Sequence, residues 1–410
     1  PGRRPRLARP EPRGGSGGGG TTSGEEGARR RADAGARVGR GVRAWLGGDV
    51  RIGPGVSVGD GAVLVADDLD LGRDVHIGAG CDVRAAQVSI GDGSQLQDGV
   101  TVLVADRFAV GRGSRLEHRV SITCRRFLAG DLFYFGHDSG VGYGGTTAST
   151  STVDAGHRVA LGPHSVLNAN LPIVLEDDVG SGCYLSVWTH GFHFGHRLLD
   201  GFDATFAGVH IERNVWLGYH VTVLPGVRVG ADTILAAGAV VSRDLPSGVL
   251  AAGVPAVVKR PLLAQPVTGE TADRRIEGLL EAWARELAWK GLPAVREPAG
   301  DLLVGDGHRV SPVPPGSAGP PPGGRTRLLL TVEDRPDLRT ATGTVLFELR
   351  SGTLSGRLDD VAHDLRDFLR RNALPCGATE TFRSIAPQPF RRLLEPGTPA
   401  AAADVLGEDT

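Results

Sequence analysis

The sequence predicts a parallel β-solenoid, a fold in which the chain winds into stacked, three-sided coils. Aliphatic residues recur six positions apart in two series, and a glycine often follows the aliphatic residue. The first series consists of Ile52, Val58 and Leu64, then Leu71, Ile77 and Val83, then Ile90, Leu96 and Val102, and then Val110, Leu116 and Ile122, and each triplet begins 19 or 20 residues after the last. The second series is Ile211, Leu217, Val223, Val229, Leu235 and Val241.

A six-residue period fits the geometry of such a solenoid. Side chains alternate between the two faces of a strand, so a spacing of six returns to the same face. Six residues hold a short strand and a corner, and three such sides close one coil. An α-helix would instead repeat its apolar residues with a period of 3.6. We therefore expect roughly seven or more coils between residues 50 and 260, with the aliphatic side chains on the axis.

Two segments interrupt the repeat and are expected to leave the coils as loops. Residues 125–156 hold the aromatic cluster Phe127, Phe133, Tyr134 and Phe135, followed by a run rich in glycine, serine and threonine. Residues 190–208 hold three histidines, His190, His193 and His196. Because a solenoid accepts insertions at its corners, and such loops often carry function, the second segment is a candidate active-site loop.

Composition changes on both sides of the coils. The first 44 residues are rich in arginine and glycine and poor in apolar residues, which predicts disorder. Residues Thr271 to Lys290 predict an amphipathic helix with Ile276, Leu279, Leu280, Trp283 and Leu287 on one face. We divide the chain into a disordered tail at 1–44, the solenoid at 45–262, a helical extension at 263–310, a Pro/Gly linker at 311–325, a small α/β domain at 326–397 and a disordered tail at 398–410.

The small α/β domain contains no recognisable catalytic motif. Strands are expected near residues 327–333, 344–350 and 353–356, and a helix from Leu358 to Asn372. That helix places Val361, Leu365, Phe368 and Leu369 on one stripe. We expect this domain to act as a docking or capping module.

The overall composition is that of a cytoplasmic globular protein. The net charge of −2 gives no reason to expect nucleic acid as a partner. No apolar run approaches the ~18 residues of a membrane span, and no secretory signal stands at the visible N-terminus. The four cysteines are scattered without a Cys-x-x-Cys pair, which indicates reduced thiols and neither a disulfide framework nor a zinc site.

The last coils carry motifs that resemble a known family. These are Asn214-Val-Trp-Leu-Gly218, Leu224-Pro-Gly226, Ala237-Gly-Ala239 and Ala251-Ala-Gly-Val-Pro255. They are similar to the hexapeptide-repeat acyltransferases, nearest to the galactoside, maltose and xenobiotic acetyltransferases, and the resemblance covers residues 159–260. It implies an all-β left-handed parallel β-helix, a homotrimer with each active site between two subunits, acetyl-CoA as acyl donor and no metal.

The resemblance also implies a general base. The family uses a histidine on an extended loop, and Trp188-Thr-His190-Gly matches His190 to it. A histidine with a pKa near 6.5 can accept the proton of an attacking hydroxyl or amine at neutral pH. His190, His193 and His196 also form H-x-x-H-x-x-H, so another of them as the base, or a metal site, stays open. The related γ-class carbonic anhydrases bind zinc on the same solenoid.

For the acceptor, Asn168-Ala-Asn170-Leu resembles the family's Asn-x-Asn-Leu, in which the second asparagine contacts the acceptor. This matches Asn170, although both asparagines could simply stack at a corner. The family implies a sugar, a glycan or a glycosylated small molecule as acceptor, with transfer to either oxygen or nitrogen.

For the donor, the family binds pantetheine along the coils, and its phosphates lie after the last coil. The matching positions are Trp216, Gly218, Tyr219, Ala237 and Gly238 for pantetheine, and Ser242, Arg243, Lys259 and Arg260 for the phosphates. Trp216 could also be an ordinary surface aromatic. Tyr219 departs from the family, which has a small residue there. Val257 stands where many relatives have arginine, and Lys259 could replace that charge.

The sequence thus favours a coenzyme A-dependent acyltransferase. Two other functions remain open: a metalloenzyme like the γ-class carbonic anhydrases, and a non-catalytic scaffold that kept the solenoid. The pairing of the His190 loop with the pantetheine motifs favours the acyltransferase.

Overall fold

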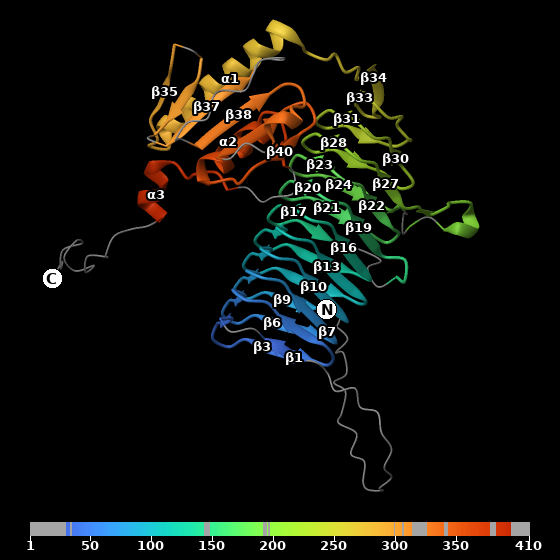
Figure 1. Cartoon of the computed structure of the whole chain (residues 1–410). Coiled ribbons are helices and arrows are strands. Elements are labelled where there is room, and N and C mark those ends of the chain that lie inside the picture. Colours follow the sequence, from blue (N-terminus) through green and yellow to red (C-terminus); the bar gives the residue numbers. More distant parts are fainter. Residues whose placement is uncertain are drawn as a thin grey trace, which may run out of the picture.

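The computed structural model describes residues 30–32, 35–142, 148–191, 195, 197–298, 300–305, 307–313, 326–339, 343–377 and 383–394. The chain forms a tall parallel β-helix, and a smaller α/β domain lies beside its upper coils (Figure 1). The faces of the β-helix are three sheets of ten, twelve and ten strands, which are parallel except for the last strand of the twelve-stranded sheet. We call them the first, second and third face, in the order in which each coil visits them.

The strands of each face follow one another at one strand per coil. The first face contains β1 (Arg30–Ala32), β4 (Val50–Ile52), β7 (Asp68–Leu71), β10 (Gln87–Ile90), β13 (Arg107–Val110), β16 (Arg126–Ala129), β19 (Thr152–Ala155), β22 (Ile173–Leu175), β27 (Val209–Ile211) and β30 (Arg228–Val229). The second contains β2 (Arg37–Val38), β5 (Ser57–Val58), β8 (His76–Ile77), β11 (Gln95–Leu96), β14 (Arg115–Leu116), β17 (Tyr134–Phe135), β20 (Ala160–Leu161), β23 (Gly180–Ser181), β28 (Trp216–Leu217), β31 (Ile234–Leu235), β33 (Val249–Ala252) and β34 (Val257–Pro261). The third contains β3 (Arg43–Leu46), β6 (Val63–Ala66), β9 (Asp82–Arg84), β12 (Thr101–Val104), β15 (Ser121–Cys124), β18 (Gly140–Val141), β21 (Val166–Asn168), β24 (Ser186–Trp188), β29 (Thr222–Val223) and β32 (Val240–Val241).

The six-residue period sets the core as predicted. Ile211, Leu217, Val223 and Val229 are all 0% exposed and belong to one continuous apolar cluster along the axis. Successive aliphatic residues pair in register between coils, for example Leu217 with Leu235. Because a coil has too little interior to fold alone, stacking on its neighbours buries these side chains.

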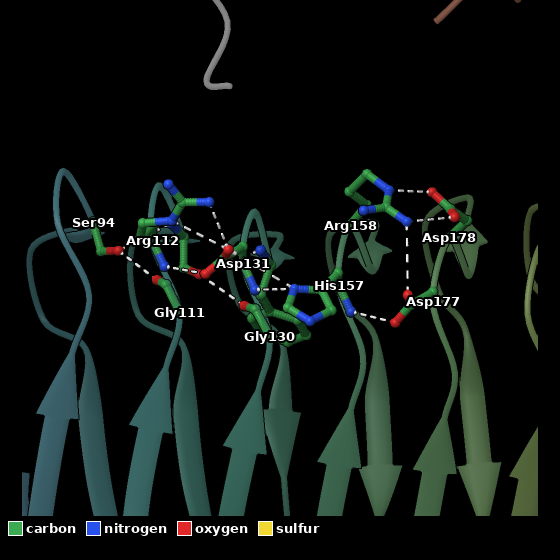
Figure 2. A network of polar contacts seen from close by, with 11 residues as sticks. Ser94, Gly111, Arg112, Gly130, Asp131, His157, Arg158, Asp177 and Asp178 are labelled. Carbon is green, nitrogen blue, oxygen red and sulfur yellow. Dashed lines mark hydrogen bonds and ion pairs between the residues drawn. The ribbon is translucent and has the colours of Figure 1, made fainter. Parts of the chain in front are cut away.

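The glycines of the repeat are explained by the corners. A Cβ atom on Gly111 would lie 2.5 Å from the backbone nitrogen of Asp131 in the next coil, so only glycine fits. Asp131 in turn accepts the backbone N–H of Arg112 through Oδ1 at 2.8 Å. Asp177 does the same for His157 at 2.8 Å. This ladder of corner carboxylates, shown in Figure 2, satisfies backbone donors that the parallel sheets leave unpaired.

The aromatic segment at 125–156 was expected to leave the coils, and that expectation is wrong for its first half. Phe127, Phe133 and Phe135 are at most 1% exposed and belong to the axial core, with Phe127 on β16 and Phe135 on β17. Phe127 pairs in register with Phe108 of the previous coil, and their rings stack at 5.8 Å. Phenylalanine therefore replaces an aliphatic residue on the axis without breaking the repeat. The interruption of the repeat falls in sequence between β18 and β19.

The solenoid also begins earlier than the expected boundary at residue 45. Strands β1, β2 and β3 belong to the first described coil and pair in register with β4, β5 and β6. Val42 and Leu46 pack against the axial core, while Arg37, Arg40 and Arg43 are exposed. A coil needs only a few inward aliphatic residues, so its arginine-rich outer surface resembled a disordered tail in sequence. Residues 1–29 and 398–410, expected to be disordered, lie outside the described residues.

The C-terminal part is one domain and not the two that the sequence suggested. The helix α1 (Gly269–Trp289) packs with α2 (Asp360–Arg371) and a six-stranded sheet on one shared core. The sheet order is β35 (Ala294–Arg296), β36 (Leu302–Val304), β37 (His308–Val313), β38 (Thr326–Thr331), β39 (Thr344–Glu348) and β40 (Thr353–Ser355). The remaining elements are the helix α3 (Gln388–Leu394) and the short 3₁₀ helices η1 (Leu198–Asp200) and η2 (Pro336–Leu338). The expected extension at 263–310 and the α/β domain at 326–397 thus share a core, and β37 occupies the start of the expected linker at 311–325.

A buried polar network joins the two long helices of this domain. Asp364 is fully buried and accepts hydrogen bonds from Trp283 Nε1 at 2.8 Å and Lys290 Nζ at 2.6 Å. Its Oδ2 also accepts the backbone N–H of Ile385 at 2.7 Å. A buried carboxylate with three donors fixes one packing of α1 on α2.

Among the described residues, no helix has the length and apolar character needed to cross a membrane.

Candidate active site

A short hairpin leaves the third face and carries His190. After β24 the chain passes through Thr189 into β25 (His190–Gly191), and it returns along β26 (Thr205–Phe206). The two strands are antiparallel, with His190 opposite Phe206, and the hairpin projects from the solenoid at the right of Figure 1. The expected loop at 190–208 is therefore present. His193 and His196 lie outside the described residues.

Aromatic rings hold the imidazole of His190 in place. The ring stacks on that of Phe206 with centroids 6.0 Å apart, and it meets the edge of Trp188 at 6.4 Å. His190 is half-buried and lines an open groove of about 660 Å³. The other residues that line the groove are Trp188, Gly191, Thr205, Leu224, Pro225 and Ser242. A groove of this volume is large enough for a small-molecule ligand.

The floor of the groove is built by the repeat itself. Val187, Val223 and Val241 pair in register across three coils, so the residue after each one occupies the same edge of the third face. Trp188, Leu224 and Ser242 therefore form a column beneath the hairpin. Sequence reasoning placed Ser242 at the donor phosphates, whereas the structure brings it to the groove that holds His190.

Asn168 and Asn170 take different positions one coil below His190. Asn168 is 1% exposed, pairs in register with Trp188, and its Oδ1 accepts no hydrogen bond in the described structure. Asn170 is half-buried, and its backbone N–H donates to Thr189 Oγ1 at 2.8 Å. The two asparagines are therefore not equivalent corner residues. Asn170 lies at the same edge of the third face as His190, while its contact with an acceptor stays a prediction.

The predicted pantetheine residues lie on the second face and at the corner between the second and third faces. Trp216 on β28 is 50% exposed and covers Gly180, whose Cβ would lie 3.0 Å from the indole. Gly218 leaves no room for a side chain, because a Cβ there would lie 2.7 Å from the backbone of the next coil. Tyr219 is 54% exposed and meets the edge of Tyr184 at 5.7 Å. Ala237 and Gly238 form the exposed corner of the following coil, where Gly238 has a φ of +73°.

The four residues expected at the donor phosphates do not cluster within one chain. Ser242 and Arg243 follow β32, at the end of the third face. Lys259 and Arg260 lie on β34, which runs antiparallel to β33 in the second-face sheet. The separation arises because the chain reverses after Gly253 and does not continue the coil. All four residues are exposed.

The comparisons with known proteins agree with this architecture. Residues 208–243 match the family described as bacterial transferase hexapeptide (six repeats). This segment is therefore similar to the hexapeptide repeat of bacterial transferases. A galactoside O-acetyltransferase of Lactococcus lactis is 54% identical over 52 residues, which cover 13% of this chain and 25% of that protein. A galactoside O-acetyltransferase of Escherichia coli is 35% identical over 113 residues, which cover 26% of this chain and 55% of that protein.

Among solved structures, a hexapeptide-repeat-containing acetyltransferase of Vibrio cholerae, complexed with acetyl coenzyme A, is also similar. The match has 26% identity and a TM-score of 0.27, and it covers 32% of this chain and 72% of that chain. This chain spans about a quarter of the length of the first curated relative and about half of the second.

Around the hexapeptide repeat, the predicted site residues form two groups at opposite edges of the third face. Asn170, His190 and Ser242 stand where its strands end, and Tyr219 and Gly238 stand where its strands begin. The three-residue strand β24 makes this face about 10 Å wide, at roughly 3.3 Å per residue. One group offers an imidazole and polar side chains beside a groove. The other offers exposed backbone and aromatic surface.

Proposed function

We propose that the chain is an acetyltransferase that moves an acetyl group from acetyl coenzyme A to a hydroxyl or an amine, with His190 as general base. The observation that carries this proposal is the position of the His190 imidazole. The ring lies between those of Trp188 and Phe206 and lines an open groove. The similarity to galactoside O-acetyltransferases supports the reaction class. A non-catalytic scaffold has no need of a histidine held beside such a groove.

In the proposed reaction, His190 accepts the proton of the acceptor as its oxygen or nitrogen attacks the thioester carbonyl. The tetrahedral intermediate carries a negative oxygen, which backbone N–H groups would stabilise. The carbon–sulfur bond then breaks, and the thiolate of coenzyme A leaves with the proton returned by the imidazolium. A positioned base of this kind contributes about 10²–10⁴-fold to the rate.

The acceptor is proposed to be a sugar or a glycosylated molecule, on the strength of the galactoside O-acetyltransferases to which the chain is similar. Asn170 is the proposed acceptor contact. It lies one coil below His190 and is hydrogen-bonded to Thr189, the residue before the base. An acceptor in the groove could therefore meet both side chains.

The active form is proposed to be a homotrimer with shared sites. His190 and the predicted pantetheine residues Tyr219 and Gly238 lie at opposite edges of the third face. A donor held along the Tyr219 edge of one subunit would present its thioester to His190 of the next. Closed symmetric assemblies of this kind repeat the same interface around the ring.

The experiment is an assay of coenzyme A release from acetyl-CoA with a panel of sugars and amino sugars. With an acceptor that works, His190→Ala should lower kcat by about 10²–10⁴-fold and leave the affinity for coenzyme A nearly unchanged. His76→Ala is the matched control, because that imidazole lies on an early coil, where it hydrogen-bonds Ser57 at 2.9 Å. Near-normal turnover in His190→Ala would contradict the proposed base, and activity that depends on added zinc would favour a metalloenzyme.

A further inference from the structure

The corner between the second and third faces carries a column of outward side chains. One residue per coil adopts the left-handed backbone conformation there, and consecutive coils supply Arg119, Asp138, His164, Tyr184 and His220, with φ between +57° and +61°. A second column precedes the first by one residue and includes His137. The backbone N–H of His164 donates to the carbonyl of His137 at 3.0 Å, so these two residues stand on adjacent coils.

Three of these side chains converge. His137 Nδ1 lies 2.9 Å from Asp138 Oδ2, and the rings of His137 and His164 meet edge to face with centroids 5.0 Å apart. One ligand atom from each of His137, Asp138 and His164 lies within 4.8 Å of the others, and all three residues are half-buried. Nothing in the proposed acetyl transfer uses this cluster.

We propose that His137, Asp138 and His164 bind one divalent metal ion of the zinc type. Two imidazoles and a carboxylate are ligands that zinc accepts, at about 2.0–2.2 Å. Ligand atoms of a tetrahedral site lie about 3.4 Å apart, so small side-chain rotations would close the cluster onto an ion. Three protein ligands leave a fourth position for water. Imidazole nitrogen favours zinc and its neighbours in the transition series over calcium or magnesium.

The neighbouring groups prepare the ligands. Arg119 donates from Nε to Asp138 Oδ1 and from Nη2 to Oδ2, both at 2.7 Å. These hydrogen bonds, and the contact with His137, hold the pKa of the Asp138 carboxyl well below its usual range, so it is ionised at neutral pH. A carboxylate offers about four acceptor positions, and these contacts occupy three. On the other side, Tyr184 stacks on His164 with centroids 4.8 Å apart and fixes the ring plane.

The site lies where the number of residues from one coil to the next is larger than in the regular repeat. Arg119 and Asp138 are 19 residues apart on adjacent coils, whereas Ser139 and Ser165 are 26 apart on the next pair. In sequence, the extra residues fall between β18 and β19, beyond the strand that follows Asp138. An ion that joins His137 to His164 would fasten the two coils on either side of this insertion. A metal ion that binds the folded chain and not the unfolded chain would stabilise the fold.

The test is calorimetric titration of zinc sulfate into the full, chelator-stripped and tag-free chain. The three loop histidines are first replaced in His190→Ala, His193→Ala and His196→Ala, so that a loop site cannot contribute. We expect one zinc ion per chain in this background. His137→Gln and His164→Gln should each weaken binding by about 100-fold or more. His157→Gln is the control, because that imidazole accepts the backbone N–H of Asp131 at another corner.

Cobalt(II) gives a second measurement that does not depend on heat. Its visible d–d bands should appear in the background protein and in His157→Gln, and should be lost in His137→Gln and His164→Gln. Circular dichroism melts show whether each variant is folded. Folded His137→Gln and His164→Gln variants that bind metal like the background, or a background protein that binds none, would overturn the site. Because acetyl transfer is not measured, neither result bears on the proposed function.

Discussion

The hydroxyl of Thr189 accepts the backbone N–H of Asn170 at 2.8 Å, and this bond joins the coil that carries the His190 hairpin to the coil below it. Thr189 Oγ1 also accepts the N–H of Leu171 at 3.0 Å and donates to the carbonyl of Asn168 at 2.8 Å. The side chain is fully buried, although the residue directly precedes His190. One hydroxyl thus satisfies three backbone groups where the chain leaves the solenoid.

Thr189→Val tests this role, since valine has nearly the same shape but no hydroxyl. It would leave the part-buried N–H groups of Asn170 and Leu171 without this acceptor, at a cost of up to about 1–3 kcal/mol each. We expect a lower free energy of unfolding and a raised KM for the acceptor, because Asn170 would shift. Thr189→Ser keeps the hydroxyl and should restore most of both quantities. Equal stability of the valine and serine variants in denaturant titrations would contradict the assignment.

The axial core could be predicted because a spacing of six has a direct physical meaning. Leu217 and Val223 were placed on the axis from the repeat alone, and both are 0% exposed. The repeat was followed through aliphatic residues only, so Phe127 and Phe133 were assigned to a loop although they occupy axial positions. Axial volume varies from coil to coil, and sequence spacing does not report it.

Features that depend on distant contacts could not be predicted. Trp283 and Asp364 are 81 residues apart, and their hydrogen bond helps to make α1 and the later strands a single domain. Likewise, the break in the repeat predicted a loop at His190, but no spacing rule indicated that Lys259 would lie on an antiparallel strand away from Arg243. The cluster at His137 and His164 was missed because the irregular interval between them hides their common corner.

Because Arg243 lies apart from Lys259 and Arg260, mutations can show which of these residues bind the donor phosphates. Lys259 and Arg260 share the exposed strand β34 on the second-face sheet, the same sheet as Trp216. We expect Lys259→Ala/Arg260→Ala to raise the KM for acetyl-CoA several-fold with little change in kcat, because phosphate contacts far from the reacting carbon contribute mainly uniform binding. Steady-state kinetics at two salt concentrations measure this. Unchanged KM in the double variant, with the effect found in Arg243→Ala, would place the phosphates at the other edge.

The cysteines should differ sharply in reactivity. Burial raises the pKa of Cys81 and Cys376 to about 11 and that of Cys124 to about 12. At pH 8 the thiolate fraction of such groups is about one in a thousand or less, and the thiolate is the reactive form. Cys183 is only half-buried. We expect an aromatic disulfide reagent to modify Cys183 alone in the native protein and all four cysteines in guanidinium. Rapid native modification of a second thiol would contradict the burial described here.

Mixing two inactive variants tests whether each active site is shared between subunits. His190→Ala removes the proposed base but leaves intact the edge of the third face that carries the predicted pantetheine residues. Ala237→Trp places a bulky side chain on that edge at an exposed position, so the fold should tolerate it. Each variant alone should be nearly inactive. After joint unfolding and refolding at equal amounts, about a quarter of the interfaces in a mixed trimer combine an intact base with an intact donor edge.

We therefore expect the mixture to recover roughly a quarter of the native turnover, whereas variants that are refolded separately and then combined should recover almost none. Refolded native protein carried through the same procedure corrects for losses. Light scattering on the same samples reports whether a trimer forms. If each site lay within one subunit, no combination could regain activity, because every chain in the mixture carries one of the two lesions. If trimers formed but activity did not recover, the shared site would be contradicted while the proposed trimer would be supported.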